Sequence, residues 1–152
     1  MMSDYFNVIL QMRKRYLKRF LLCIIVLLPM QSLFAVEVIT NSDNVAQMQG
    51  SNNLRSIFSM RTRYWPNGEK IRVFVLADDS EVHKKFVKQK LQMFPHQLRR
   101  TWDRMTYTGT GQPPITVHST AEMLEKIKTT KNSIGYIDRR VEDEAIHFFD
   151  AQ

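Results

Sequence analysis

Hydrophobic and polar residues along positions 36–149 follow two different spacings. Short apolar runs, several of them rich in β-branched residues, are typical of strands and occupy residues 36–40, 71–76, 134–137 and 145–149. Between these runs, apolar residues recur every three or four positions, which predicts amphipathic helices beginning near residues 51, 78, 95 and 119. Strands and helices therefore alternate, and the sequence predicts a single layered α/β domain.

Large side chains on the inner faces of the predicted helices should form the core. We expect four of them to pack against the sheet: Phe58, Phe86, Trp102 and Ile127. The sheet positions that should receive them are Val38, Val73, Val75 and Ile137. The last apolar run contains Phe148 and Phe149, which point to opposite faces if the run is extended, so one of them should be buried.

Polar residues mark where the predicted helices begin and where loops interrupt the chain. The candidate helix starts are a cap at Ser51, capping-box spacings at Asp78/Glu81 and Ser119/Glu122, and Pro95 in a first turn. The predicted loops and turns are the polar stretch 41–50, Trp65-Pro66-Asn67-Gly68 and residues 108–114.

The first 35 residues have the composition of an export signal. A basic run at 13–19 precedes a short apolar run at 20–28, and Ala35 offers a small residue for cleavage. We predict a signal peptide over residues 1–35, cleavage near the Ala35–Val36 bond, and a periplasmic domain over residues 36–152. The alternative is an uncleaved anchor, but an anchor needs about 20 apolar residues. No stable membrane insertion is therefore expected after cleavage.

More than half of the net charge of +7 lies on the predicted signal. Five of the 22 Lys and Arg residues and one of the 15 Asp and Glu residues precede position 36, so the mature part keeps 17 bases, 14 acids and a net charge of +3. That balance is too mild to predict nucleic-acid binding. The one cysteine, Cys23, also lies in the signal, so the mature part has no thiol nucleophile and no disulfide.

The usual motifs for catalysis and for metal binding are missing from the mature sequence. No two of His83, His96, His118 and His147 are four residues apart, which removes the common helical metal pair. His83 lies beside lysines and is expected to be solvated. There is no G-x-S-x-G motif, and the glycine-containing loop at 108–114 ends in prolines, which lack the N–H donors of a phosphate cradle. We therefore expect no enzyme activity, no metal site and no cofactor.

Basic residues gather on two successive predicted helices, at Lys84, Lys85, Lys88, Arg99, Arg100 and Arg104. Such a surface is either a docking face for an acidic partner or anionic lipid, or a solvated face. The solvated face is the favoured interpretation.

A series of short motifs spans roughly residues 36–140: Ile57-Phe58, Trp65-Pro66-Asn67-Gly68, Phe86, Trp102, Gly111-Gln112-Pro113-Pro114 and Ile134-Gly135-Tyr136. In this order and spacing, the chain resembles the phosphate-binding proteins of ABC importers, and more closely the short stand-alone proteins grouped with them. Full-length members of that family clamp the anion between two lobes, whereas the resemblance covers only the second lobe. It implies one lobe of a type II periplasmic binding protein, with the two ends of the lobe close together.

The resemblance also gives a position for the family's anion loop, which reads arginine, two variable residues and Gly-Ser-Gly-Thr. Aligned on Phe86, the arginine position is Leu76, and the loop positions become Asp79, Ser80, Glu81 and Val82. Only Ser80 matches, so Ser80 is the one ligand-binding residue that the resemblance carries over. The acidic residues around it would repel a phosphate dianion, which needs cations and free donors.

These observations together favour an exported, non-catalytic binding or interaction module of the cell envelope, whose partner is an envelope protein or a small anion. One alternative is a solute-binding protein for phosphate or another small anion in an ABC importer or sensor system, working as a homodimer that rebuilds a cleft. The second alternative is a small periplasmic enzyme.

Overall fold

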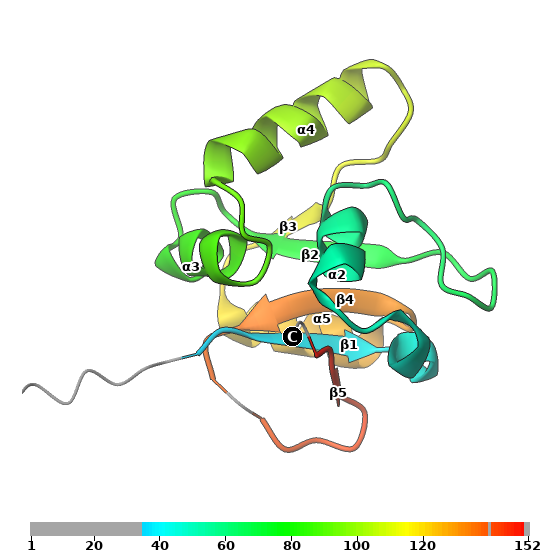
Figure 1. The fold of residues 1–152 in the computed structure, drawn as a ribbon. Coiled ribbons are helices and arrows are strands. Elements are labelled where there is room, and N and C mark those ends of the chain that lie inside the picture. Colours follow the sequence, from blue (N-terminus) through cyan, green and yellow to red (C-terminus); the bar gives the residue numbers. More distant parts are fainter. Residues whose placement is uncertain (1–34, 140, 151–152) are drawn as a thin grey trace, which may run out of the picture. The chain divides into compact units, whose positions relative to one another are not determined.

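A five-stranded mixed sheet lies at the centre of the described chain, residues 35–139 and 141–150 of a computed structural model. Its strands are β1 (Glu37–Asn41), β2 (Arg72–Leu76), β3 (Ile115–Val117), β4 (Ser133–Ile137) and β5 (His147–Phe148), in the order β3-β2-β4-β1-β5 (Figure 1). Strand β2 runs parallel to β3 and β4, and β1 runs antiparallel to β4 and β5. The predicted α/β class is confirmed. The predicted signal peptide lies outside the described residues, apart from Ala35.

Helices connect these strands, and the apolar spacing of the sequence predicted all of them except one. They are the 3₁₀ helix η1 (Asp43–Met48) and the α-helices α2 (Ser51–Phe58), α3 (Glu81–Gln89), α4 (Pro95–Tyr107) and α5 (Thr120–Thr129). The exception is η1, because the stretch 41–50 was expected to be a loop. Instead Val45 and Met48 are buried, and Asn41 still belongs to β1. Within the described ranges, no helix is long and apolar enough to cross a membrane.

The sheet separates two helical layers, and β4 contacts both of them, because successive side chains of a strand point to opposite faces. A side-chain carbon on Gly135 would lie 2.4 Å from the sulfur of Met123 and 3.2 Å from Ile127, both on α5. Glycine thus lets α5 approach this face of the sheet. The ring of the next residue, Tyr136, stacks on Phe86 of α3 on the other face, with 3.9 Å between the ring centroids. Helix α4 lies farther out, over α3 (Figure 1).

The predicted core residues are buried almost without exception. Phe58, Phe86, Trp102 and Ile127 are each at most 2 % exposed, and Val38, Val75 and Ile137 lie beneath them in the sheet. Val73 differs, because it sits near the start of β2 at the rim and remains half-buried. The assignment of inner helix faces from the apolar spacing is therefore confirmed.

The first and last described strands lie side by side, as the single-lobe resemblance implied. Strand β5 pairs with β1 through Ile39 and Phe148, and the backbone N–H of Phe149 donates to the carbonyl of Val38 at 3.0 Å. Phe149 is buried and Phe148 is half-buried, which confirms the predicted alternation. The strand itself is shorter than the expected run 145–149.

Two of the predicted helix starts were wrong, and two were confirmed at least in part. Gly50, not Ser51, is the N-cap of α2. Ser119 caps α5 as expected, but the Glu122 carboxylate accepts from the N–H of His118 instead of completing a capping box. Pro95 begins α4. The other wrong start, Asp78, belongs to the candidate site.

Candidate functional site

The carboxyl ends of β2, β3 and β4 meet at one edge of the sheet, because these strands are parallel. Ligands of open α/β sheets commonly bind outside this edge. We call it the carboxyl edge. Residues 77–80 leave β2 here and lead into α3, while His118 and Ser119 lead from β3 into α5. The segment aligned with the family's anion loop therefore lies at this edge, with Ser80 at the start of α3.

Ser80 serves as the N-cap of α3. Its Oγ accepts a hydrogen bond from the backbone N–H of His83 at 3.4 Å. The prediction that Asp78 and Glu81 form a capping box is wrong, because the N-cap is Ser80, two residues after Asp78, and the helix itself begins at Glu81. The Ser80 hydroxyl keeps its own proton, so it could still donate one hydrogen bond to a ligand.

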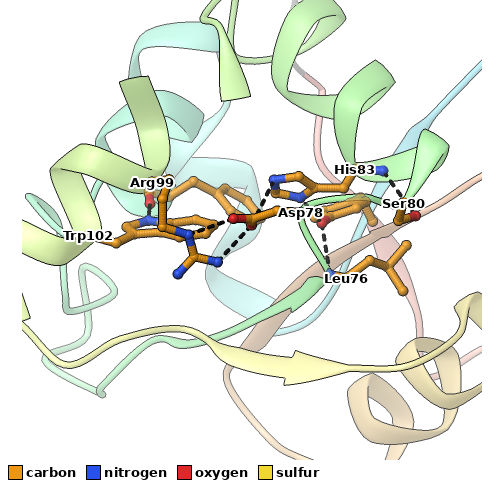
Figure 2. A network of polar contacts seen from close by, with 8 residues as sticks. Leu76, Asp78, Ser80, His83, Arg99 and Trp102 are labelled. Atoms are coloured by element: carbon orange, nitrogen blue, oxygen red, sulfur yellow. Dashed lines mark hydrogen bonds and ion pairs between the residues drawn. The ribbon is translucent and has the colours of Figure 1, made fainter. Parts of the chain in front are cut away.

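The Asp78 side chain instead binds Arg99 of α4. Figure 2 shows the carboxylate between Arg99 and His83, with both of its oxygens facing the guanidinium at 2.6 and 2.7 Å. The Arg99 guanidinium also lies over the ring of Trp102, 5.0 Å from its centroid. Hydrogen bonding to Arg99 holds the pKa of Asp78 below its usual range. This ion pair joins α4 to the segment that follows β2, and it pairs the Arg99 guanidinium with a carboxylate close to the start of α3.

His83 continues inward from Asp78 and is only 1 % exposed, so the expectation that it is solvated was wrong. Its Nε2 lies 3.8 Å from Asp78 Oδ1, and its Nδ1 lies 2.5 Å from the Tyr136 hydroxyl. That hydroxyl accepts a hydrogen bond from the N–H of Leu76 at 2.9 Å. Burial lowers the pKa of His83 and raises that of Tyr136, so both are neutral at pH 7. Because Nε2 faces the Asp78 carboxylate, we assign the imidazole proton to Nε2, and the Tyr136 hydroxyl then donates to Nδ1.

Asp78, His83 and Tyr136 stand in the order of a proton relay, from carboxylate through imidazole to hydroxyl. A relay acts on a substrate only if the terminal hydroxyl can reach it. Tyr136 is fully buried and covered by Phe86, and its hydroxyl already bonds the backbone of β2. The chain of contacts thus holds β2, α3 and β4 together, and the hydroxyl at its inner end is enclosed by the protein.

The buried imidazole predicts acid-sensitive stability. Because the pKa of His83 is lower in the folded domain than its usual 6.5, the unfolded chain takes up the proton first as pH falls. The contribution of neutral His83 to the free energy of unfolding should be complete above pH 6.5. It should decline as the pH falls below that value. Urea unfolding between pH 7 and pH 5 measures this slope.

Two substitutions separate His83 from the other histidines. His83→Gln keeps an acceptor for the Tyr136 hydroxyl and should flatten the slope. His96→Gln, at an exposed position of α4, should leave the slope as in the unsubstituted protein. Equal slopes in all three proteins would show that His83 does not carry the effect.

The remaining predicted surface residues lie apart from this network. Lys84 pairs with Glu81 at 2.8 Å, while Lys85, Lys88, Arg100 and Arg104 are exposed along α3 and α4. Of the six basic residues on these helices, Arg99 therefore has the structural role that the sequence did not predict. Within the described residues, no group of three or more His, Cys, Asp or Glu side chains could hold a metal ion.

A second candidate site lies at the opposite edge of the sheet, where β2 and β3 begin. It is a pocket of about 570 Å³ between the end of α2, residues 63–73, and the loop 109–114. We call it the amino-edge pocket. The sequence did not predict this pocket, and residues 108–114 were interpreted only as a loop. The three cations that line the pocket lie far from that loop in sequence. They are Arg63, Lys70 and Arg72.

Comparison with known proteins gives similarity of fold over part of the chain. No family model and no curated protein matches the sequence. PstS from Borrelia burgdorferi is 21% identical with a TM-score of 0.48, over 68% of this chain and 40% of its own. An ABC-type phosphate transport receptor from Vibrio cholerae is 13% identical with a TM-score of 0.49, over 76% of this chain and 47% of its own. The chain spans less than half the length of either protein, and both likenesses concern the course of the chain alone.

Proposed function

We propose that the mature chain is a non-catalytic binding module of the cell envelope that does not hold phosphate at the start of α3. The observation that supports this most directly is the bidentate ion pair between Asp78 and Arg99. It lies at the carboxyl edge, where an anion would need the free guanidinium for itself. The envelope location rests on the predicted export signal.

The charges around Ser80 oppose a phosphate dianion. Asp79 and Glu81 flank the serine in sequence, and Asp78 keeps Arg99 occupied. The Ser80 hydroxyl can donate one hydrogen bond, whereas tight phosphate binding takes several charge-assisted bonds. An ion held at this open edge would also stay in contact with water, where charge interactions are weak. A solute-binding role through this edge is therefore disfavoured.

We expect that millimolar phosphate does not raise the melting temperature of the purified protein, compared with chloride at equal ionic strength. A ligand at 100 times its dissociation constant adds about 2.7 kcal/mol to the free energy of unfolding. That would raise the melting temperature of a domain of this size by several degrees, so a thermal melt is a sensitive test. A rise that Ser80→Ala removes would contradict the proposal and favour the solute-binding alternative.

Two matched variants test the physical reason. Asp78→Ser removes one negative charge and frees Arg99, whereas Asp79→Ser removes the same charge and leaves the ion pair intact. Phosphate should stabilise the Asp78→Ser protein more than the Asp79→Ser protein. If the two variants respond alike, the ion pair is not what keeps phosphate out.

The interaction role predicts a discrete protein partner. Cross-linking of the protein in its native envelope should give one defined adduct whose yield does not depend on phosphate. An adduct that forms only when phosphate is present would indicate a solute receptor instead.

A further inference from the structure

The amino-edge pocket has the lining of a small-molecule site. Its volume of about 570 Å³ falls within the roughly 300–1,000 Å³ typical of such sites. Apolar side chains form much of its wall, including Ile57, Met60 and Val73, and Ile115 at the start of β3 is 50% exposed. Tyr64, which is 55% exposed, adds an aromatic ring. A ligand with an apolar body could therefore bury part of its surface here.

All the charged side chains that line the pocket are cationic. They are Arg63, Lys70 and Arg72. Among the described residues, the ion pairs of the domain involve none of these three. The nearest acid in sequence, Glu69, accepts a hydrogen bond from the side chain of Asn67 within its own turn. Three cations beside an apolar wall, without a carboxylate in the lining, favour an anionic occupant.

Two of the cations are held in place by neutral groups. Arg63 Nη1 donates to the carbonyl oxygen of Thr110 at 2.9 Å, and Lys70 Nζ donates to Gln112 Oε1 at 2.5 Å. Neutral acceptors orient the charges without cancelling them, and both side chains keep further donors for a ligand. The cations are thus positioned in advance, which reduces the entropy lost on binding.

The walls are fixed by the surrounding fold. Tyr64 pairs with Lys70 across a bridge, and the buried ring of Trp65 anchors that hairpin through its hydrogen bond to the carbonyl of Asn132. On the other side, a side-chain carbon at Gly111 would lie 2.9 Å from the sulfur of Met60. Glycine therefore lets the loop 109–114 lie directly against the end of α2, where it closes one side of the pocket.

We propose that the amino-edge pocket binds a small amphipathic anion, an organic phosphate or carboxylate carried on an apolar or aromatic body. The anionic group faces Arg63, Lys70 and Arg72, and the apolar body lies against Ile115 and Tyr64. The pocket lies at the opposite edge of the sheet from Ser80. Its occupancy is therefore independent of whether the carboxyl edge holds phosphate, and variants of the two edges distinguish the two outcomes.

The test is titration of phenyl phosphate into the protein purified from cells that express the full chain. Binding followed by calorimetry and by backbone amide NMR should be saturable, with shifts confined to residues 57–73 and 109–115. Inorganic phosphate lacks the apolar body and phenol lacks the charge, so both should bind more weakly. Equal binding of phenol, or shifts centred on Ser80, would overturn the proposal.

Charge substitutions locate the site. Arg72→Gln should weaken phenyl phosphate binding by about tenfold, the effect of losing one charge-assisted contact. Lys70→Gln provides a second variant with the same expected loss, in case Arg72→Gln lowers stability. Arg100→Gln removes the same charge from the exposed face of α4, outside the pocket lining, and should leave binding unchanged. Equal losses of affinity in Arg72→Gln and Arg100→Gln would show that binding depends on net charge alone. That result would contradict the proposed site.

The apolar wall and the class of ligand are tested in the same way. Ile115→Thr keeps the β-branched shape in β3 but makes the wall more polar, and it should reduce the preference for phenyl phosphate over inorganic phosphate. A short peptide of acidic residues should compete only weakly. If that peptide binds the pocket more tightly than phenyl phosphate, the pocket is a docking site for a protein and the small-molecule proposal fails.

Discussion

Replacing Trp102 by alanine should lower the free energy of unfolding by about 3–5 kcal/mol, the usual effect of removing a buried aromatic side chain. Trp102 is 2% exposed, and its Nε1 donates to the carbonyl of Phe58 at 2.7 Å. The change would leave a cavity between α4 and α2, an unpaired carbonyl, and no ring beneath Arg99. Since domains of this kind are stable by about 5–15 kcal/mol, much of the stability would be lost.

Urea unfolding followed by circular dichroism measures this effect. Tyr107→Ala is the matched control, because Tyr107 lies on the same helix and is 96% exposed. It should change the free energy of unfolding by no more than about 0.5 kcal/mol. A Trp102→Ala protein as stable as this control would place Trp102 outside the core and would contradict the packing of α4.

Removing only the hydroxyl of Tyr136 should also destabilise the domain, by about 1–3 kcal/mol, although Tyr136→Phe keeps the ring and its stacking on Phe86. The hydroxyl is the acceptor for the N–H of Leu76 and the donor to His83. Without it, both groups are left buried and unpaired, and each costs desolvation free energy that water cannot restore.

The same unfolding experiment tests this prediction, with Tyr64→Phe as the control. Tyr64 is 55% exposed, so loss of its hydroxyl should leave the midpoint of unfolding unchanged. Tyr136→Phe should also change the dependence on pH, because His83 would then lose the partner that fixes its tautomer. A midpoint equal to that of the unsubstituted protein would show that water replaces the hydroxyl.

The two edges of the sheet differ in how their charges are used. At the carboxyl edge, Asp78 and Arg99 neutralise each other and connect to a buried network. At the amino edge, Arg63 and Lys70 bond to neutral oxygens and keep their charge. This difference is why we place the binding of an organic anion at the edge where a parallel sheet does not usually bind ligands.

The apolar spacing predicted most of the layout because it reports local geometry. Helices α2 to α5 and strands β1, β2 and β4 follow from periods that the neighbouring residues impose on each other. Strand β3 was not predicted, because three residues are too short to show a period and its pairing with Phe74 to Leu76 is a contact between distant segments. Helix η1 was missed because six residues are too few to show a period, and only Val45 and Met48 reach the core.

Side-chain roles were harder to predict than elements because they depend on partners far away in sequence. His83 was expected to be solvated, since lysines follow it directly. It is buried instead, and its Nδ1 contacts the hydroxyl of Tyr136, 53 residues later. Asp78 was expected to cap a helix, but Arg99, 21 residues later, binds it instead. A signal was available in the apolar spacing, because His83 shares the inner face of α3 with Phe86 and Val87.

The sequence by itself determined the α/β class, the inner faces of the helices and the acidic character of the segment around Ser80, because these properties belong to residues and to their near neighbours. Only the tertiary structure decided which charges remain available. It paired Asp78 with Arg99, enclosed His83, and gathered Arg63, Lys70 and Arg72 around one pocket. The physical reason is that the interaction energy of a charge depends on its distance to counter-charges and on its access to water. Folding sets both.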